Sequence, residues 1–131
     1  MEFIQWTEKY SVGDPLMDAY HHVFFQTIQD LAETLDAMPL DVVGERIAFL
    51  LSYASMHFES EEHLMRTHAF PDLETHTAMH QAFREQLSYI QDSYQANPSA
   101  RIAEQLLSLT QDWLTTHILS EDMKYKPYLK R

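Results

Sequence analysis

Five histidines and two carboxylates in this chain have the side-chain types and the spacing of a metal site. The seven candidate ligands are His21, His57, Glu61, His76, His80, His117 and Asp122. Two pairs lie four residues apart and would therefore share one helix face: His57 with Glu61, and His76 with His80. The chain has no cysteine, so any metal is held by nitrogen and oxygen. Such donors suit iron at a dinuclear centre, and manganese or zinc on ligand type alone.

These residues occupy positions where helical periodicity places apolar side chains. Apolar residues recur every three or four positions from Met17 to Met38, and His21 is in step with Phe24 and Ile28. Burying so many unpaired imidazoles and carboxylates would cost several kcal/mol or more. A single buried histidine is commonly satisfied by a backbone hydrogen bond, but seven converging polar groups need a shared partner. We therefore interpret them as ligands of a cofactor in the protein interior.

The ligand count leaves room for one small molecule. Around two six-coordinate metals, five imidazoles, two bridging carboxylates and one solvent-derived bridge would fill all positions but one. A site with one vacant position is suited to binding one small molecule. That the carboxylates bridge is an assumption, which the spacing alone does not establish.

Four helices are predicted from the apolar spacing and the scarcity of breakers, since the chain has only two glycines and five prolines. The predicted ranges are about 17–38, 41–66, 72–96 and 98–123. We expect Asp41 to cap the second helix, Asn97 and Pro98 to begin the fourth, and the fourth to persist past Asp122. Residues 1–16 are predicted to form an irregular arm held against the helices by Trp6, with Phe3 and Ile4.

The fold class expected is all-α, a single domain over residues 1–131, arranged as an antiparallel up-down-up-down four-helix bundle. Short connections make consecutive helices antiparallel neighbours. All seven ligands then meet at one end of the bundle. On a continuous helix His117 and Asp122 diverge by about 140°, so they converge only on something between neighbouring helices.

Charge and composition exclude several classes of partner. With 20 acidic and 9 basic residues the formal charge is -11, which repels nucleic acid and anionic membranes. Neither a secretory signal nor a stretch of membrane-spanning length is visible. We expect a cytoplasmic, monomeric protein with no nucleic-acid partner and no membrane insertion.

The sequence around the ligands resembles the hemerythrin family, in particular its single-domain bacterial members, the bacteriohemerythrins. The resemblance covers the whole chain. The segments that carry it are Trp6, Ser11-Val12-Gly13, Asp18-x-x-His21, His57-Phe58-x-x-Glu61-Glu62-x-x-Met65, His76-x-x-x-His80 and Trp113-x-x-x-His117-Ile118-x-x-x-Asp122-x-x-Tyr125.

This resemblance implies a non-haem di-iron centre with an oxo or hydroxo bridge. It implies that one iron is held by His76, His80 and His117, the other by His21 and His57, and that both carboxylates bridge the pair. O2 would bind reversibly at the two-histidine iron. The implied function is O2 carriage, storage or delivery to an O2-consuming enzyme, rather than enzymatic catalysis.

Apolar residues beside the ligands are expected to form a dry O2 pocket. They are Phe24, Phe58, Trp113, Leu114 and Ile118. Excluding water and extra protons would hinder loss of the bound species as peroxide, which would leave an oxidised, inactive centre. Plain core packing is the alternative for each of the five.

The first motif departs from the family, which commonly has glutamine before the ligand and lysine after it. Here Tyr20 and His22 stand at those positions, which leaves a choice of ligand. We choose His21, because His22 is rotated by about 100° from the apolar stripe. His22, His63, His68 and the carboxylate of Glu62 are expected to be solvated, and the role of Tyr125 stays open.

Three other functions compete with O2 carriage. A di-iron oxidase, or a peroxide- or NO-reacting enzyme, usually uses four carboxylates and two Glu-x-x-His pairs, whereas this set has two carboxylates and five imidazoles. A sensor of O2 or iron needs an output module or a partner surface. Iron storage needs an acidic channel and an assembled shell, which the helical stripes do not indicate.

Overall fold

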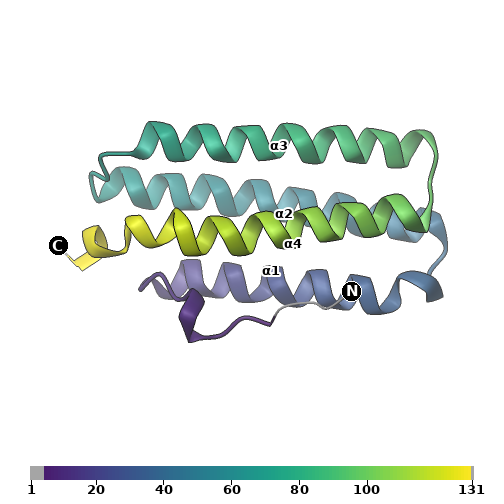
Figure 1. The fold of residues 1–131 in the computed structure, drawn as a ribbon, viewed down its shortest axis with the longest axis horizontal. Helices are drawn as coiled ribbons and strands as arrows, with labels where there is room; N and C mark the ends of the chain where they lie inside the picture. Colours follow the sequence, from purple (N-terminus) through teal and green to yellow (C-terminus); the bar gives the residue numbers. More distant parts are fainter. Residues whose placement is uncertain (1–4, 131) are drawn as a thin grey trace.

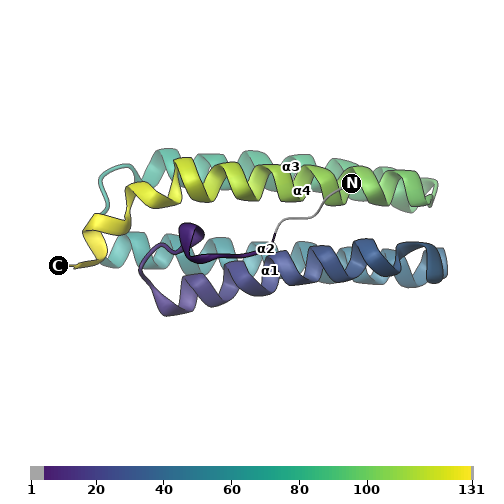
Figure 2. The same ribbon diagram turned by 60° about the horizontal axis from the view of Figure 1, so that its bottom comes forward.

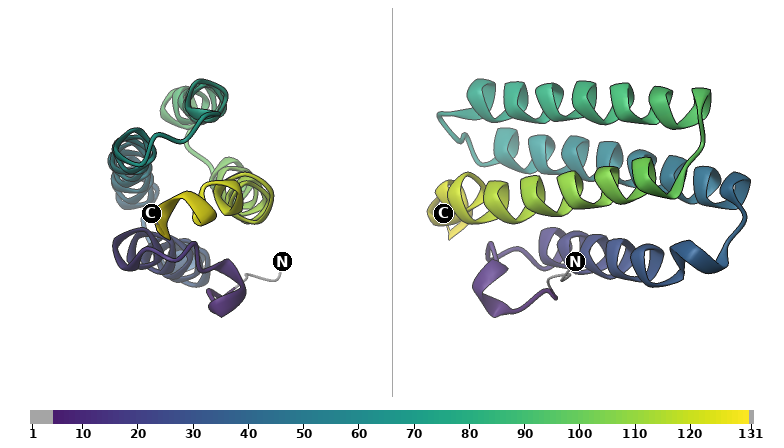
Figure 3. Two further views of the ribbon diagram at one scale, coloured as in Figure 1. Left: turned by 90° about the vertical axis from the view of Figure 1, so that its left-hand side faces the viewer. Right: turned by 45° about the vertical axis from the view of Figure 1, so that its right-hand side comes forward.

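Four α-helices build the protein, and the computed structural model describes residues 5–130. The helices are α1 (Pro15–Thr34), α2 (Leu40–Thr67), α3 (Leu73–Ala96) and α4 (Ala100–Ser120). Consecutive helices run antiparallel (Figure 1), and the end-on view in Figure 3 shows all four packed around one axis. Short 3-10 helices occur at Glu8–Tyr10, Leu35–Ala37, Asp122–Lys124 and Lys126–Lys130. This is the expected all-α, up-down-up-down bundle.

Each helix turns an apolar face inward, as the periodicity predicts. Phe24, Phe58, Phe83 and Leu106 come one from each helix and are almost completely buried. Apolar side chains fill the half of the bundle that contains the α1–α2 and α3–α4 connections. None of the described helices is long and apolar enough to cross a membrane.

The ends of α1 differ from the sequence prediction. The helix begins at Pro15, where the fixed φ of proline suits a first turn, and Asp14 caps it by accepting a hydrogen bond from the Met17 N–H at 3.0 Å. It ends at Thr34, and a 3-10 helix over Leu35–Ala37 takes the place of its predicted last turn. The chain then extends through Pro39 into α2.

Two predicted caps are wrong. α2 begins at Leu40, so Asp41 lies inside its first turn, where its charge suits the positive end of the helix dipole. α4 begins at Ala100, and its cap is Ser99, whose hydroxyl accepts from the Ile102 N–H at 3.1 Å. Asn97 instead ends α3.

The end of α4 also corrects a prediction, because the α-helix does not persist past Asp122. The last α-helical residue is Ser120, and Glu121 joins it to the 3-10 helix that Asp122 begins. The Glu121 N–H still bonds to the His117 carbonyl at 2.8 Å. This change of winding allows the carboxylate of Asp122 to face the same interior space as His117.

The N-terminal arm packs beside α1 and close to the C-terminal turns (Figure 2). The Ser11 hydroxyl and the Val12 N–H both donate to the Asp18 carboxylate, at 2.6 and 2.9 Å. Lys126 donates to the Ser11 carbonyl at 3.0 Å and so links the arm to the C-terminal segment. Trp6 stacks on His22, whereas Phe3 and Ile4 lie outside the described residues.

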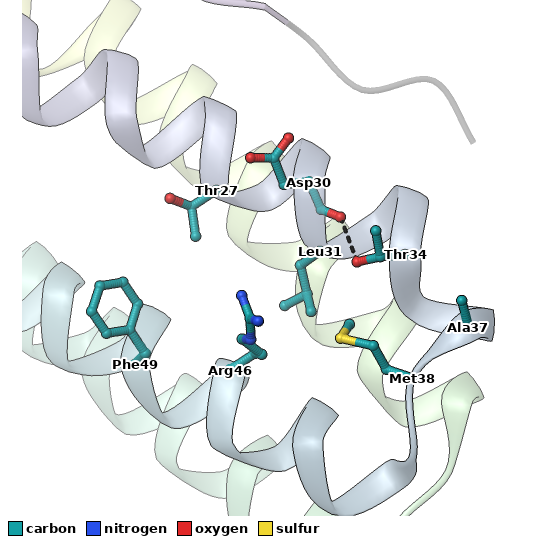
Figure 4. A pocket seen from close by; sticks show the side chains of 8 residues that line it. All are labelled: Thr27, Asp30, Leu31, Thr34, Ala37, Met38, Arg46 and Phe49. Atoms are coloured by element: carbon teal, nitrogen blue, oxygen red, sulfur yellow. Dashed lines mark hydrogen bonds between the residues drawn. The ribbon is translucent and has the colours of Figure 1, made fainter.

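A surface hollow of about 540 Å³ lies between α1 and α2, at the end of the bundle remote from the candidate ligands (Figure 4). Leu31 and Met38 form part of its apolar wall, and Arg46 and Phe49 extend from α2. The hollow contains none of the residues that the sequence marks for metal chemistry.

Candidate metal centre

All seven predicted ligand side chains lie in the same end of the bundle. His21 comes from α1, His57 and Glu61 from α2, His76 and His80 from α3, His117 from α4, and Asp122 from the following 3-10 helix. They are buried, and none is more than 4% exposed. The antiparallel order of the helices therefore produces the convergence that the sequence predicts.

The ligand atoms form two overlapping groups. The first, here called the three-histidine group, contains Glu61, His76, His80, His117 and Asp122. The second, the two-histidine group, contains His21, His57 and Glu61. Within each group one potential ligand atom per residue lies within 4.8 Å of every other. Glu61 belongs to both groups, so the two are adjacent.

The three-histidine group is tightly packed. The Nε2 atoms of His76 and His80 each lie 3.0 Å from Glu61 Oε1, and the Nε2 atoms of His76 and His117 each lie 3.0 Å from Asp122 Oδ1. The Nε2 atoms themselves approach closely, since His117 is 2.9 Å from His76 and 3.2 Å from His80. Three ring nitrogens and two carboxylates thus face one small space.

The two-histidine group is looser. His21 Nε2 is 3.5 Å from Asp122 Oδ2, and His57 Nε2 is 3.6 Å from Glu61 Oε2. Both nitrogens of His21 and His57, and both oxygens of Asp122, are buried without a hydrogen-bond partner. Buried polar atoms in this state are costly, and a cation bound between the two Nε2 atoms and the Asp122 oxygens would satisfy those atoms, although not the two Nδ1 atoms. The residues present therefore fit a metal.

The electrostatics also suit metal ligation. Burial, reinforced by His57, lowers the pKa of His21 to about 4, so its imidazole is neutral at pH 7. Burial opposes ionisation of Glu61, but the histidines that face it hold the pKa of its carboxyl well below the usual range. A neutral imidazole and an ionised carboxylate are the forms that bind metals.

His76 behaves differently. Burial alone would lower its pKa, but its contacts with Asp122 and Glu61 raise it to about 9. Without a metal, a proton on His76 therefore supplies part of the positive charge that the two carboxylates require.

Two residues whose role the sequence did not indicate touch the ligands. Glu62 accepts a hydrogen bond from the Nδ1–H of His80 at 2.7 Å, and its side chain is only 13% exposed. The expectation that Glu62 is a surface carboxylate is therefore wrong. Tyr125 is completely buried, and its hydroxyl donates to Glu61 Oε2 at 2.9 Å. Its position three residues after Asp122 was the only signal in the sequence.

Aromatic rings cover the three-histidine group. Phe58 stacks on His80 with ring centres 4.2 Å apart, and Trp113 stacks on His117 at the same separation. Phe24 lies 6.0 Å from His57 in an edge-on arrangement. The other two predicted pocket residues, Leu114 and Ile118, are buried in α4. Of the five, only Trp113 is partly exposed.

The remaining histidines lie away from the two groups. His22 and His63 are exposed and His68 is partly exposed, as expected. His21, rather than His22, faces the interior. Tyr20, one of the two residues that depart from the family pattern, lies with its ring 5.4 Å from that of His57.

Comparisons with known proteins agree with this geometry. Residues 12–129 match the family model described as "Hemerythrin HHE cation binding domain". A myohemerythrin of Theromyzon tessulatum is 28% identical over 122 residues, which cover 93% of this chain and 90% of that protein. A bacteriohemerythrin of Stenotrophomonas maltophilia is 25% identical over 130 residues, covering 99% and 84%.

The fold has a close match among solved structures. A crystal structure of wild-type hemerythrin superposes with a TM-score of 0.89 at 24% identity, covering 99% of this chain and 100% of that one. The predicted fold class and the predicted family resemblance are both confirmed. This chain belongs to the hemerythrin HHE cation-binding family.

Proposed function

We propose that this protein binds O2 reversibly at a di-iron centre held by the three-histidine and two-histidine groups. The observation that carries the proposal is the arrangement of the two shared carboxylates. Glu61 Oε1 faces the three-histidine group, and its Oε2 lies 3.6 Å from His57 Nε2. Asp122 Oδ1 likewise faces His76 and His117, and its Oδ2 faces His21. Each carboxylate thus presents one oxygen to each group, as a bridging ligand must.

The unequal number of histidines in the two groups supports a vacant coordination position on one of the two iron ions. His76, His80 and His117 would hold one iron, and His21 and His57 the other, so the second iron has one protein ligand fewer. Bound iron would supply the redox-active site at which O2 binds. The manganese and zinc alternatives use the same donors, and metal analysis of the purified protein distinguishes them.

The chain's own residues keep the site dry. Phe24, Phe58, Leu114 and Ile118 are almost completely buried, and Trp113 lies flat against His117. We assign these five to the O2 pocket, where they exclude water and stray protons from the centre. Burial and the nearby Glu61 raise the pKa of Tyr125 well above its usual value, so its hydroxyl keeps its proton and continues to donate to Glu61.

The donor set favours binding over catalysis. Oxygen-activating bundle sites commonly use four carboxylates, whereas this centre has two carboxylates and five imidazoles. We therefore infer a monomeric O2 carrier or store in the cytoplasm, which delivers O2 to a consuming enzyme, rather than an oxidase or a sensor. The formal charge of -11 keeps such a protein soluble and apart from nucleic acid.

An anaerobic optical titration tests the proposal. The protein is loaded with iron, reduced, exposed to O2 and then sparged with argon through several cycles. A new absorption spectrum that appears with O2 and disappears with argon in every cycle is expected. A single irreversible oxidation, with peroxide or another product released, would overturn reversible binding and favour the enzyme or sensor alternatives.

A further inference from the structure

Two charged residues outside the proposed ligand set lie next to the three-histidine group. We propose that Glu62 is a positioning residue that fixes the ring of His80, and that Arg84 holds Glu62 in place. This inference rests on the proposed metal centre and assigns functions to two residues that do not themselves bind the metal.

The contact between His80 and Glu62 has the geometry of a strong hydrogen bond. The distance from Nδ1 to Glu62 Oε2 is 2.7 Å, at the short end of the range for bonds to a charged acceptor. The other nitrogen, Nε2, lies 3.0 Å from Glu61 Oε1 and faces the metal ligands. A metal on Nε2 requires the ring proton on Nδ1, so Glu62 selects both the tautomer and the rotation of the ring.

Arg84 links this hydrogen bond to the α2–α3 interface. Its Nη1 lies 3.9 Å from Glu62 Oε2, close enough for an ion pair. Its Nε donates to the Ser55 hydroxyl at 3.2 Å, and its Nη2 to the Ser55 carbonyl at 3.4 Å. Arg84 therefore reaches from α3 to Ser55 and Glu62 on α2, which precede and follow Phe58 in the sequence. These contacts restrict where the carboxylate of Glu62 can move.

The same arginine also supports the face of the His80 ring. Phe58 stacks on His80 at an interplanar angle of 12°, and the Arg84 guanidinium lies 5.2 Å from the centre of the Phe58 ring. His80 is thus held at its edge by Glu62 and at its face by Phe58, and Arg84 contacts both. By contrast, the Nδ1 atoms of His21 and His57 are buried without a hydrogen-bond partner.

The consequence is a difference between the two metal ions. A carboxylate that accepts from the outer nitrogen of a ligand histidine makes the imidazole a stronger donor, and losing such a partner lowers metal affinity by about 10- to 100-fold. Substituting Glu62 should therefore lower the affinity for one of the two metal ions, the one held by the three-histidine group. The ion held by His21 and His57 should bind nearly as before.

The test is an anaerobic titration of metal-free protein with Co²⁺, followed by visible absorption. Wild-type protein is compared with Glu62→Gln, which preserves shape and removes the charge, and with Glu59→Gln, an exposed control on the same helix. We expect Glu62→Gln to lose about 10- to 100-fold in affinity for one of two Co²⁺ ions, and Glu59→Gln to lose none. Circular dichroism checks that both variants are folded.

Arg84→Met separates its positioning role from general packing. Arg84→Met should lower affinity for the same Co²⁺ ion by less than Glu62→Gln does. In the double variant it should lower that affinity little further, because the Glu62 carboxylate that Arg84 holds is already absent. The Nδ1–H proton of His80 provides a second measurement, since its NMR signal should shift in Glu62→Gln but not in Glu59→Gln.

Two outcomes would overturn the inference, and they differ. If Glu62→Gln binds both Co²⁺ ions like wild type with an unshifted His80 signal, Glu62 has no positioning role, while the metal centre itself stands. If wild-type protein binds no Co²⁺ at all, the proposed centre and this inference are both wrong.

Discussion

The two halves of the candidate centre share Glu61 yet are supported very differently. In the three-histidine group every Nε2 atom lies 3.0 Å from a carboxylate oxygen, and Phe58 and Trp113 stack on two of the rings. In the two-histidine group the corresponding distances are 3.5–3.8 Å, and four ring nitrogens have no hydrogen-bond partner. The first group is held by the protein itself, whereas the second depends on the metal that it would bind.

The protonation of the histidines explains this difference. A proton on His76 can replace a cation between Glu61 and Asp122, so the three-histidine group tolerates the absence of metal. Burial and His57 disfavour a proton on His21, so His21 does not supply a positive charge in this way. A protein that leaves one half of its centre less satisfied keeps that half available for an added ligand.

The largest expected effect comes from removing the carboxylate that both halves share. Glu61→Ala should lower affinity for both metal ions by more than about 100-fold, because the variant leaves five buried imidazoles with one carboxylate. Metal content after gel filtration should fall from two ions per chain to less than one. A variant that still holds two ions would show that the groups are independent of Glu61.

Single histidine substitutions should affect the two halves unequally. His57→Ala leaves one imidazole in its group, so we expect one metal per chain and no reversible response to O2. His80→Ala leaves two imidazoles and two carboxylates in the other group, so metal binding there should weaken without being abolished. Metal content and the O2 titration measure both. Equal losses in the two variants would contradict the asymmetry.

Metal-free protein should be most stable near pH 6.5. The folded-state pKa of His21 is about 4, below the unfolded value, so its contribution is complete above pH 6.5 and is lost as pH falls towards 4. The folded-state pKa of His76 is about 9, so its contribution is complete below pH 6.5 and is lost as pH rises towards 9. Each change amounts to at most about 3 kcal/mol.

Urea unfolding of the metal-free protein across this pH range measures both slopes. His21→Gln should flatten the acid side alone, and His76→Gln the alkaline side alone. A pH profile that is unaltered by either substitution would disprove the assigned protonation states.

The smallest expected effect is that of Tyr125→Phe. This change removes the hydrogen bond to Glu61 Oε2 and should reduce the free energy of unfolding by about 1–3 kcal/mol, because a buried acceptor loses its donor. Denaturant titration measures it, with Tyr89→Phe as an exposed control. Stability equal to the control would show that Tyr125 only fills space.

Much of the fold and of the candidate site could be predicted because the relevant signals are local. Apolar spacing predicts the helices, short connections predict their antiparallel order, and polar residues within the stripes indicate the candidate ligands. The end of the α-helix at Ser120 could not be predicted, because the apolar pattern continues through Ile118. Nothing local in the sequence indicates the change from α-helix to 3-10 helix.

Glu62 could not be predicted for a different reason. It follows Glu61 and is rotated by about 100° from it, which by itself indicates a surface position. Whether that direction leads to solvent or to His80 on the next helix depends on how α2 and α3 are rotated against each other. The cap of α4 could not be predicted for a similar reason, because Asn97 and Ser99 are both acceptable caps and the backbone path decides between them.

The stacking of Trp113 on His117 gives the protein a built-in fluorescent reporter. The chain has only two tryptophans, and the other, Trp6, stacks on the exposed His22 in the N-terminal arm. Iron bound at His117 would lie close enough to the indole of Trp113 to quench its emission. Emission from Trp113, isolated in a Trp6→Phe background, should therefore report metal loading of the proposed centre in real time, without any added dye.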